Sequence, residues 1–202
     1  MLIIISNAIA EKNEAQLINE LFYAGLNIFH LRKPEVEEKD IYSILDTIET
    51  KYHAQIALHQ HHQMANKYGI NRLHFTEAKR QQTSSKVLRN LKDSGFILST
   101  SVHHISEYAG LSDCFEYTFF GPVFNSISKK GYSSTLGIDF KMPLIKNHPL
   151  AIAIGGISAA NLSEALNMNF AGVAALGTIW QQPEQSIAQF KTLQHAWKQT
   201  GQ

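Results

Sequence analysis

The stretch Leu150-Ala151-Ile152-Ala153-Ile154-Gly155-Gly156-Ile157-Ser158 reads as a short apolar strand that ends in a glycine turn. An amphipathic segment, Ala159–Met168, follows it, and a second apolar segment, Gly172–Leu176, comes next. A strand, a helix and a further strand in this order predict a βαβ unit, in which the two strands run parallel.

The same alternation runs back to the start of the 202 residues and on to their end. Apolar segments predict eight strands, at Leu2–Ser6, Asn27–Leu31, Gln55–His59, Arg72–Phe75, Phe96–Val102, Phe115–Phe120, Leu150–Ile154 and Gly172–Leu176. Amphipathic segments predict the helices, at Glu11–Ala24, Glu37–Tyr52, His62–Tyr68, Ser84–Asp93, Ile105–Ala109, Asp139–Lys146, Ala159–Met168 and Glu184–Lys198.

Eight units of about 25 residues predict an α/β fold of the (β/α)8 TIM-barrel type, with residues 1–202 as a single domain. A doubly wound sheet is the alternative architecture. The first βα turn of a dinucleotide-binding sheet carries a glycine fingerprint, whereas Ser6-Asn7-Ala8-Ile9 contains no glycine. The barrel is therefore favoured.

The composition argues against nucleic acid and membranes as partners. Lys and Arg total 18 against 17 Asp and Glu, so the net charge of +1 offers no basic surface for nucleic acid or for an anionic membrane. No apolar run approaches the roughly 18 residues of a transmembrane helix, and Met1–Ile5 lacks the basic region of a signal peptide. Cys114 is the only cysteine, so we expect no internal disulfide and a cytoplasmic protein.

Strand parity predicts which side chains enter the barrel, because alternate residues of a strand point to opposite faces. Phe29 and Leu31 are expected to face the helices, and His30 and Arg32 to point inward. The inward polar side chains at carboxyl ends of strands are expected to converge at one mouth of the barrel; they are His30, Arg32, His59, His74 and His103.

The last two strands suggest a phosphate site. In the seventh strand, Ile152 and Ile154 are expected to face the helices, and Gly155 and Gly156 follow them. Gly177 and Thr178 follow the eighth strand. Backbone amides after the last two strands of a barrel, together with a small extra helix, commonly bind phosphate, and glycine lets the backbone approach it closely.

Four elements of the sequence resemble the thiamine phosphate synthase/TenI family, in the family's order and over nearly the whole chain. The first is Phe120-Gly121-Pro122-Val123-Phe124 followed by Ser126, Ser128, Lys129 and Lys130. The others are His30-Leu31-Arg32-Lys33, then Ser101-Val102-His103 with Glu107, and Ala153–Ile157 with Asn161. The resemblance also implies a (β/α)8 barrel, in agreement with the strand and helix pattern.

The resemblance implies a thiamine-biosynthetic transferase that joins hydroxymethylpyrimidine diphosphate to thiazole phosphate, giving thiamine phosphate and diphosphate. It places Arg32, Ser126, Ser128 and Lys129 on the diphosphate, where positive charge stabilises the leaving group. It places Ser101 beside the pyrimidine, and the glycine loops, with Gly155, Gly156, Gly177 and Thr178, on the thiazole phosphate.

Two departures from the family bear on the chemistry. The family's two magnesium-binding aspartates correspond to Gln60 and Lys79, so the cofactor is unknown and Mg²⁺ is expected from the family alone. The TenI branch tautomerises a thiazole carboxylate phosphate with a histidine that corresponds to Pro122. His30 or His103 is our candidate for proton transfer in its place.

Three functions therefore stay open: a synthase-like transferase, a TenI-like thiazole tautomerase and a non-catalytic barrel that binds thiamine precursors. All three take small phosphorylated heterocycles, and the family makes a homodimer plausible. We expect no metal at His59-Gln60-His61-His62, because neighbouring residues of a strand point to opposite faces.

Overall fold

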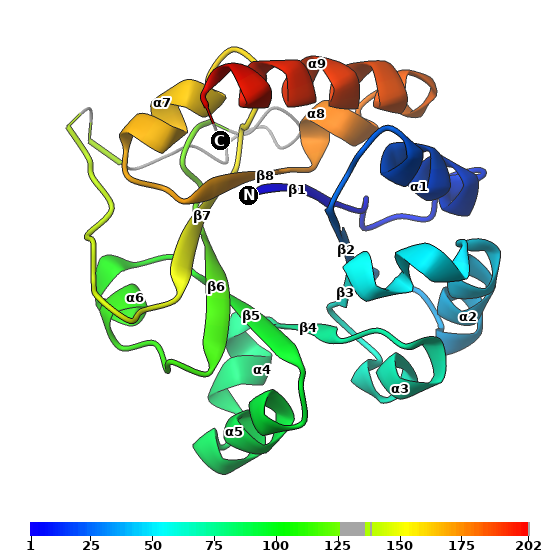
Figure 1. The fold of residues 1–202 in the computed structure, drawn as a ribbon, viewed down its shortest axis with the longest axis horizontal. Coiled ribbons are helices and arrows are strands. Elements are labelled where there is room, and N and C mark those ends of the chain that lie inside the picture. The colour runs from blue at the N-terminus through cyan, green and yellow to red at the C-terminus, as the bar shows by residue number, and fades with distance from the viewer. Residues whose placement is uncertain (126–135, 138, 202) are drawn as a thin grey trace.

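A computed structural model describes residues 1–125, 136–137 and 139–201 of the chain (Figure 1). Eight parallel strands pair in chain order and close into a barrel. They are β1 (Leu2–Ile5), β2 (Ile28–Leu31), β3 (Ile56–Leu58), β4 (Arg72–Phe75), β5 (Ile97–Val102), β6 (Phe115–Phe120), β7 (Leu150–Ile154) and β8 (Gly172–Ala175).

Helices surround this barrel in the described part of the chain. They are α1 (Glu14–Tyr23), α2 (Glu38–Thr47), α3 (Ala65–Tyr68), α4 (Glu77–Gln81), α5 (Ser85–Asp93), α6 (Ile105–Ala109), α7 (Leu162–Asn167), α8 (Gly177–Trp180) and α9 (Ser186–Gln199). Short 3₁₀ turns are η1 (Thr50–Gln55), η2 (His62–Met64) and η3 (Pro183–Gln185). The predicted (β/α)8 barrel is therefore confirmed.

The first and last strands pair with each other and close the ring. β1 pairs with β8, as Ile3 opposite Ala174 shows. On the outside, α9 contacts α1, and the side-chain amide of Gln194 in α9 donates a 3.0 Å hydrogen bond to the carbonyl of Ala24. Closure of this kind leaves no sheet edge exposed.

The barrel sheet has an apolar layer on each of its two faces, one under the helices and one in the interior. Phe29, Leu31 and their equivalents in β3, β4 and β5 belong to the layer between barrel and helices, as predicted. A smaller cluster fills the interior; it consists of Ile3, Ile5, Ile28, Tyr117, Phe119, Ile152 and Ala174.

The parity predicted for β7 is wrong. Ile152 belongs to the interior cluster, whereas Ala151 and Ala153 belong to the layer under the helices. The interior of a TIM barrel is itself packed with bulky branched side chains, so side-chain size does not distinguish its two faces.

The helix predicted over Asp139–Lys146 is absent from the described residues of that segment. Pro143 lacks a backbone N–H and disrupts a helix interior. The neighbouring backbone is also engaged elsewhere, because the Met142 N–H donates to the carbonyl of Met168 at 2.8 Å. In place of a helix, the Phe140 ring stacks on Phe120 of β6 with ring centres 5.8 Å apart.

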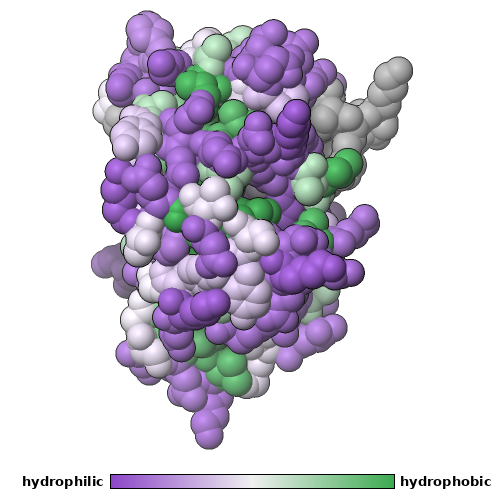
Figure 2. All heavy atoms as spheres, turned by 90° about the vertical axis from the view of Figure 1, so that its right-hand side faces the viewer, coloured by the Kyte–Doolittle hydropathy of each residue, from purple (hydrophilic) through white to green (hydrophobic). Residues whose placement is uncertain are grey.

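The face over α1, α2 and α3 is largely hydrophilic, with isolated hydrophobic side chains between polar ones (Figure 2). Within the described ranges, no helix has both the length and the apolar character needed to cross a membrane.

Candidate functional site

A cavity of about 600 Å³ opens at the carboxyl ends of the strands. Most of its wall comes from residues at or just after the ends of β2, β4, β5, β6, β7 and β8. In a TIM barrel this end carries the active site, because the βα loops converge there.

The cavity brings together most of the predicted site residues that the structure describes. Its wall includes Arg32, Ser101, His103, Gly155, Gly156, Gly177 and Thr178. The predicted diphosphate residues Ser126, Ser128 and Lys129 lie outside the described residues.

The turn after β7 depends on glycine. Gly155 and Gly156 have φ angles of +98° and +65°, in the region that side chains with a Cβ rarely adopt. The Asn161 side chain makes two hydrogen bonds to the backbone of this turn. Its Oδ1 accepts from the Ser158 N–H at 2.8 Å, and its Nδ2 donates to the Gly156 carbonyl at 2.9 Å. The backbone of this turn is therefore fixed against the cavity.

The segment after β6 packs directly on the same turn. The Val123 and Phe124 N–H groups donate to the carbonyls of Ile154 and Gly155, at 2.9 and 3.1 Å. A Cβ on Gly121 would lie 2.1 Å from the Ile154 carbonyl oxygen, so only glycine fits there. The two loops form one wall of the cavity.

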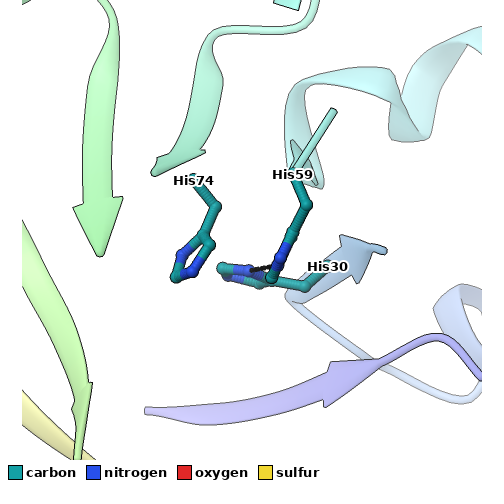
Figure 3. Close-up of side chains that lie close together, drawn as sticks. All are labelled: His30, His59 and His74. Carbon is teal, nitrogen blue, oxygen red and sulfur yellow. Dashed lines mark hydrogen bonds between the residues drawn. The ribbon is translucent and has the colours of Figure 1, made fainter. Parts of the chain in front are cut away.

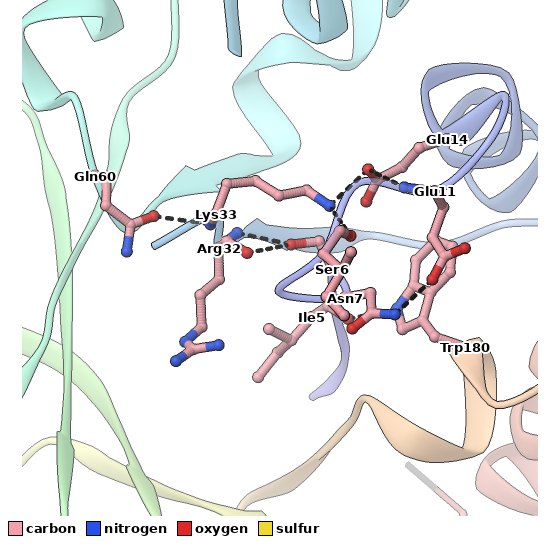
Figure 4. A network of polar contacts seen from close by, with 10 residues as sticks. Ile5, Ser6, Asn7, Glu11, Glu14, Arg32, Lys33, Gln60 and Trp180 are labelled. Atoms are coloured by element: carbon pink, nitrogen blue, oxygen red, sulfur yellow. Dashed lines mark hydrogen bonds and ion pairs between the residues drawn. The ribbon is translucent and has the colours of Figure 1, made fainter. Parts of the chain in front are cut away.

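Arg32 follows β2, and its backbone is clamped by Ser6 (Figure 4). The Arg32 N–H donates to Ser6 Oγ at 2.8 Å, and Ser6 Oγ–H donates to the Arg32 carbonyl at 2.9 Å. Figure 4 shows the guanidinium turned away from these contacts, and Arg32 lines the cavity. With its backbone held in this way, Arg32 contributes a cationic group to the cavity wall.

The neighbouring Lys33 points the other way and is not a cavity residue. Its ammonium is buried against Glu14 Oε2 at 2.6 Å and donates to the Ile9 carbonyl at 2.8 Å (Figure 4). Burial raises the pKa of Glu14, and the Lys33 charge opposes that rise. This pair ties the first βα loop to the end of β2.

His103 lies at the cavity wall with a defined tautomer. Its Nδ1 lies 2.7 Å from the Gly121 carbonyl oxygen, which only accepts, so Nδ1 carries the hydrogen. In the neutral ring Nε2 is then the proton acceptor. The His103 N–H donates to Glu107 at 3.1 Å, and this hydrogen bond lowers the pKa of Glu107.

The predicted convergence of histidines at the mouth is correct only in part. His30, His59 and His74 do meet, but inside the barrel, and none of them lines the cavity (Figure 3). His30 Nδ1 lies 2.9 Å from His59 Nε2, and its Nε2 lies 2.7 Å from the Tyr117 hydroxyl. A proton-transfer role for His30 on a cavity ligand therefore has no direct contact to support it.

His74 connects this interior cluster with the cavity. Its Nδ1 lies 3.0 Å from Ser99 Oγ, and its Nε2 lies 3.1 Å from Ser101 Oγ. Burial lowers the pKa of His30 and His59 well below the usual histidine value and that of His74 to about 3. All three rings are therefore neutral near pH 7.

Three polar cavity residues were missed by the sequence reasoning: Thr76, Glu77 and Gln81. They belong to the loop after β4 and to α4. Glu77 Oε1 accepts from the Gln81 amide at 3.1 Å. Their position directly after a barrel strand is the signal that could have indicated them.

The fold and this cavity define a (β/α)8 barrel with glycine turns and an arginine around one site at the carboxyl ends of its strands. The family model for thiamine monophosphate synthase (TMP-TENI) matches residues 1–179. The chain belongs to this family.

Relatives agree with that assignment. The thiamine-phosphate synthase of Leuconostoc citreum is 25% identical over 177 residues, which cover 82% of this chain and 81% of that protein. The barrel superposes on thiamine phosphate pyrophosphorylase from Bacteroides thetaiotaomicron with a TM-score of 0.73 and 23% identity, over 98% of this chain and 97% of that one. The corresponding protein from Pyrococcus furiosus gives a TM-score of 0.74 at 14% identity, over 98% and 96%. At these identities the two structures support the fold alone.

Proposed function

We propose that the cavity catalyses the synthase reaction, in which a pyrimidine-methyl group passes from its diphosphate to the nitrogen of a thiazole phosphate. The observation that carries the proposal is the placement of Arg32 and Ser101 with the Gly155-Gly156 and Gly177-Thr178 turns around one cavity. A cation and backbone turns around one cavity suit a substrate pair with two phosphorylated groups.

The proposed chemistry needs charge stabilisation rather than a proton transfer. The C–O bond to the diphosphate breaks, its electron pair leaves on the diphosphate oxygen, and the thiazole nitrogen donates a pair to the resulting cation. The Arg32 guanidinium stabilises the charge that develops on the leaving group. Ser101, whose hydroxyl lies 3.1 Å from His74 Nε2, is the residue that the proposal assigns to the pyrimidine.

The residues present do not match the family's magnesium site. Gln60 and Lys79 stand at the two expected carboxylate positions, and the Gln60 carbonyl oxygen is engaged by the Lys33 N–H at 2.9 Å. Among the described lining residues, Glu77 is the carboxylate. Mg²⁺ favours oxygen ligands with carboxylates among them, so no step of the proposal uses the ion.

A thiazole tautomerase is the second candidate, and His103 is the observation that favours it. Its Nδ1 is held by the Gly121 carbonyl, so Nε2 is the nitrogen that could accept a proton at the cavity. Histidine is the side chain that most often serves as a general acid or base. A precursor-binding barrel without turnover is the third.

One incubation distinguishes the three candidates. Purified protein is mixed with hydroxymethylpyrimidine diphosphate and thiazole phosphate, with Mg²⁺ or with chelator, and thiamine phosphate is followed by chromatography. A parallel reaction follows the tautomers of thiazole carboxylate phosphate. Thiamine phosphate supports the synthase; tautomer conversion alone supports the second candidate; saturable binding with no conversion supports the third.

A further inference from the structure

The interior cluster of His30, His59 and His74 is unusual because the three rings come from three successive strand ends and meet inside the barrel (Figure 3). One ring nitrogen from each lies within 4.8 Å of the others. Exposed fractions of 0%, 7% and 1% place all three away from solvent.

We propose that these three imidazoles form a binding site for one transition-metal ion of the Zn²⁺ class, distinct from the cavity above it. Imidazole nitrogen is a preferred ligand for Zn²⁺, Cu²⁺ and Ni²⁺, and three histidines with an open fourth position are an established zinc set. The sequence led us to expect no metal at His59-Gln60-His61-His62, where neighbouring residues point to opposite faces. The proposed site instead combines histidines from three different strand ends.

The spacing is close to what a tetrahedral ion requires. With Zn–N bonds of 2.0–2.1 Å, ligand nitrogens lie about 3.3 Å apart. His30 Nδ1 and His59 Nε2 are already 2.9 Å apart, and one nitrogen of each of the three rings lies within 4.8 Å of the other two. These separations are near the tetrahedral value, so ligation needs a rearrangement of the side chains and not of the strands.

The surroundings supply the outer partners that ligating histidines need. Such a histidine hydrogen-bonds its second nitrogen to a nearby acceptor, which fixes the ring. For His30 this acceptor is the Tyr117 hydroxyl at 2.7 Å, and for His74 it is the hydroxyl of Ser99 or Ser101.

His59 gives an independent indication. Its Nδ1 is buried and has no hydrogen-bond partner among the described residues, which is costly for an imidazole nitrogen. A metal bound at Nδ1, after the ring turns, would give this nitrogen the partner that it lacks.

Binding also requires a specific rearrangement. The His59 and His74 rings are stacked, with centres 3.9 Å apart and planes inclined by 24°. Because a nitrogen lone pair lies in the plane of its ring, stacked rings cannot both point at one ion. The metal must therefore turn these rings apart and replace the His30–His59 hydrogen bond.

The test uses the intact protein, first stripped with a chelator and then equilibrated with Zn²⁺ alone. After desalting, metal content is measured by mass spectrometry, and Co²⁺ is substituted to record the absorption of a tetrahedral site. We expect about one ion per chain with nitrogen ligation. Tyr117→Phe removes an outer partner without changing the ligands and should weaken binding by about tenfold.

His59→Gln and His74→Gln should lose the ion, whereas the exposed His104→Gln and His195→Gln should retain it. Circular dichroism of the metal-free variants checks that they fold. If they do not, anomalous diffraction from zinc-loaded crystals of the unsubstituted protein decides. A peak between the three rings supports the site; zinc absent, or bound only at surface histidines, overturns it.

Discussion

His74 Nε2 lies 3.1 Å from Ser101 Oγ, so a residue inside the barrel holds a side chain of the cavity wall. The other nitrogen of the same ring contacts Ser99, which is buried. The polar interior and the site are thus one connected set of hydrogen bonds. We therefore expect a substitution in the polar interior to affect the cavity wall, and a substitution in the wall to affect the interior.

Ser101→Ala tests this connection. It leaves a buried imidazole nitrogen unpaired, so we expect a loss of about 1–3 kcal/mol in the free energy of unfolding. Urea denaturation measures it, with the exposed Ser106→Ala as the matched control. Equal unfolding midpoints for the two variants would mean that the His74–Ser101 contact contributes nothing.

The buried histidines predict an acid-sensitive fold. His74 has a pKa of about 3 when folded, because burial disfavours its charged form, and a value near 6.5 when unfolded. Between these values the unfolded chain binds more protons, so stability is fully present above about pH 6.5 and falls as pH falls.

His74→Gln should flatten this dependence. Removing one such group reduces the slope of unfolding free energy by about 1.4 kcal/mol per pH unit between roughly pH 6 and pH 5. Denaturant titrations of the metal-free protein at several pH values measure the slope. An unchanged slope would contradict the folded pKa of His74.

The buried ion pair of Lys33 and Glu14 should behave as a unit. Lys33→Met or Glu14→Leu alone leaves an uncompensated buried charge and should cost about 3–5 kcal/mol, while the double variant should cost much less than the two together. Lys39→Met, in the exposed pair with Glu37, is the control and should have no measurable effect. Additive single effects would show that the pair does not interact.

Gly156→Ala should damage both fold and site. The φ of +65° strains any side chain, and the new Cβ would lie 2.3 Å from the Asn125 carbonyl oxygen. Strain of this kind costs about 1–3 kcal/mol, and a displaced turn should raise KM for the thiazole phosphate. Gly69→Ala has a similar φ of +66° with no atom within 4 Å, so it isolates strain from collision. Equal losses of unfolding free energy for the two variants would show that the collision with the Asn125 carbonyl oxygen contributes nothing.

The sequence was sufficient for the barrel and for part of the cavity wall. Period-two alternation places Phe29 and Leu31 outside and His30 inside, and seven of the predicted residues line one cavity. These follow from local pattern and from the rule that barrel sites lie at carboxyl strand ends.

Other features depend on partners distant in the chain. The depth of His30 is set by Tyr117 and His59 around it, which parity alone does not reveal. The absent helix at Asp139–Lys146 depends on Pro143 and on the Met168 carbonyl that accepts from Met142. Glu77 enters the cavity through α4, which the periodicity did not predict.

In the proposed function, the cavity around Arg32 makes thiamine phosphate from the two phosphorylated heterocycles. Steady-state rates of thiamine phosphate formation should be compared for the unsubstituted protein, Arg32→Ala and Arg89→Ala, the last removing a surface arginine paired with Asp113. We predict that product forms, that Arg32→Ala lowers kcat/KM by about a hundredfold or more, and that Arg89→Ala has no effect. Absence of product from the unsubstituted protein, or equal rates for the two arginine variants, would contradict the claim.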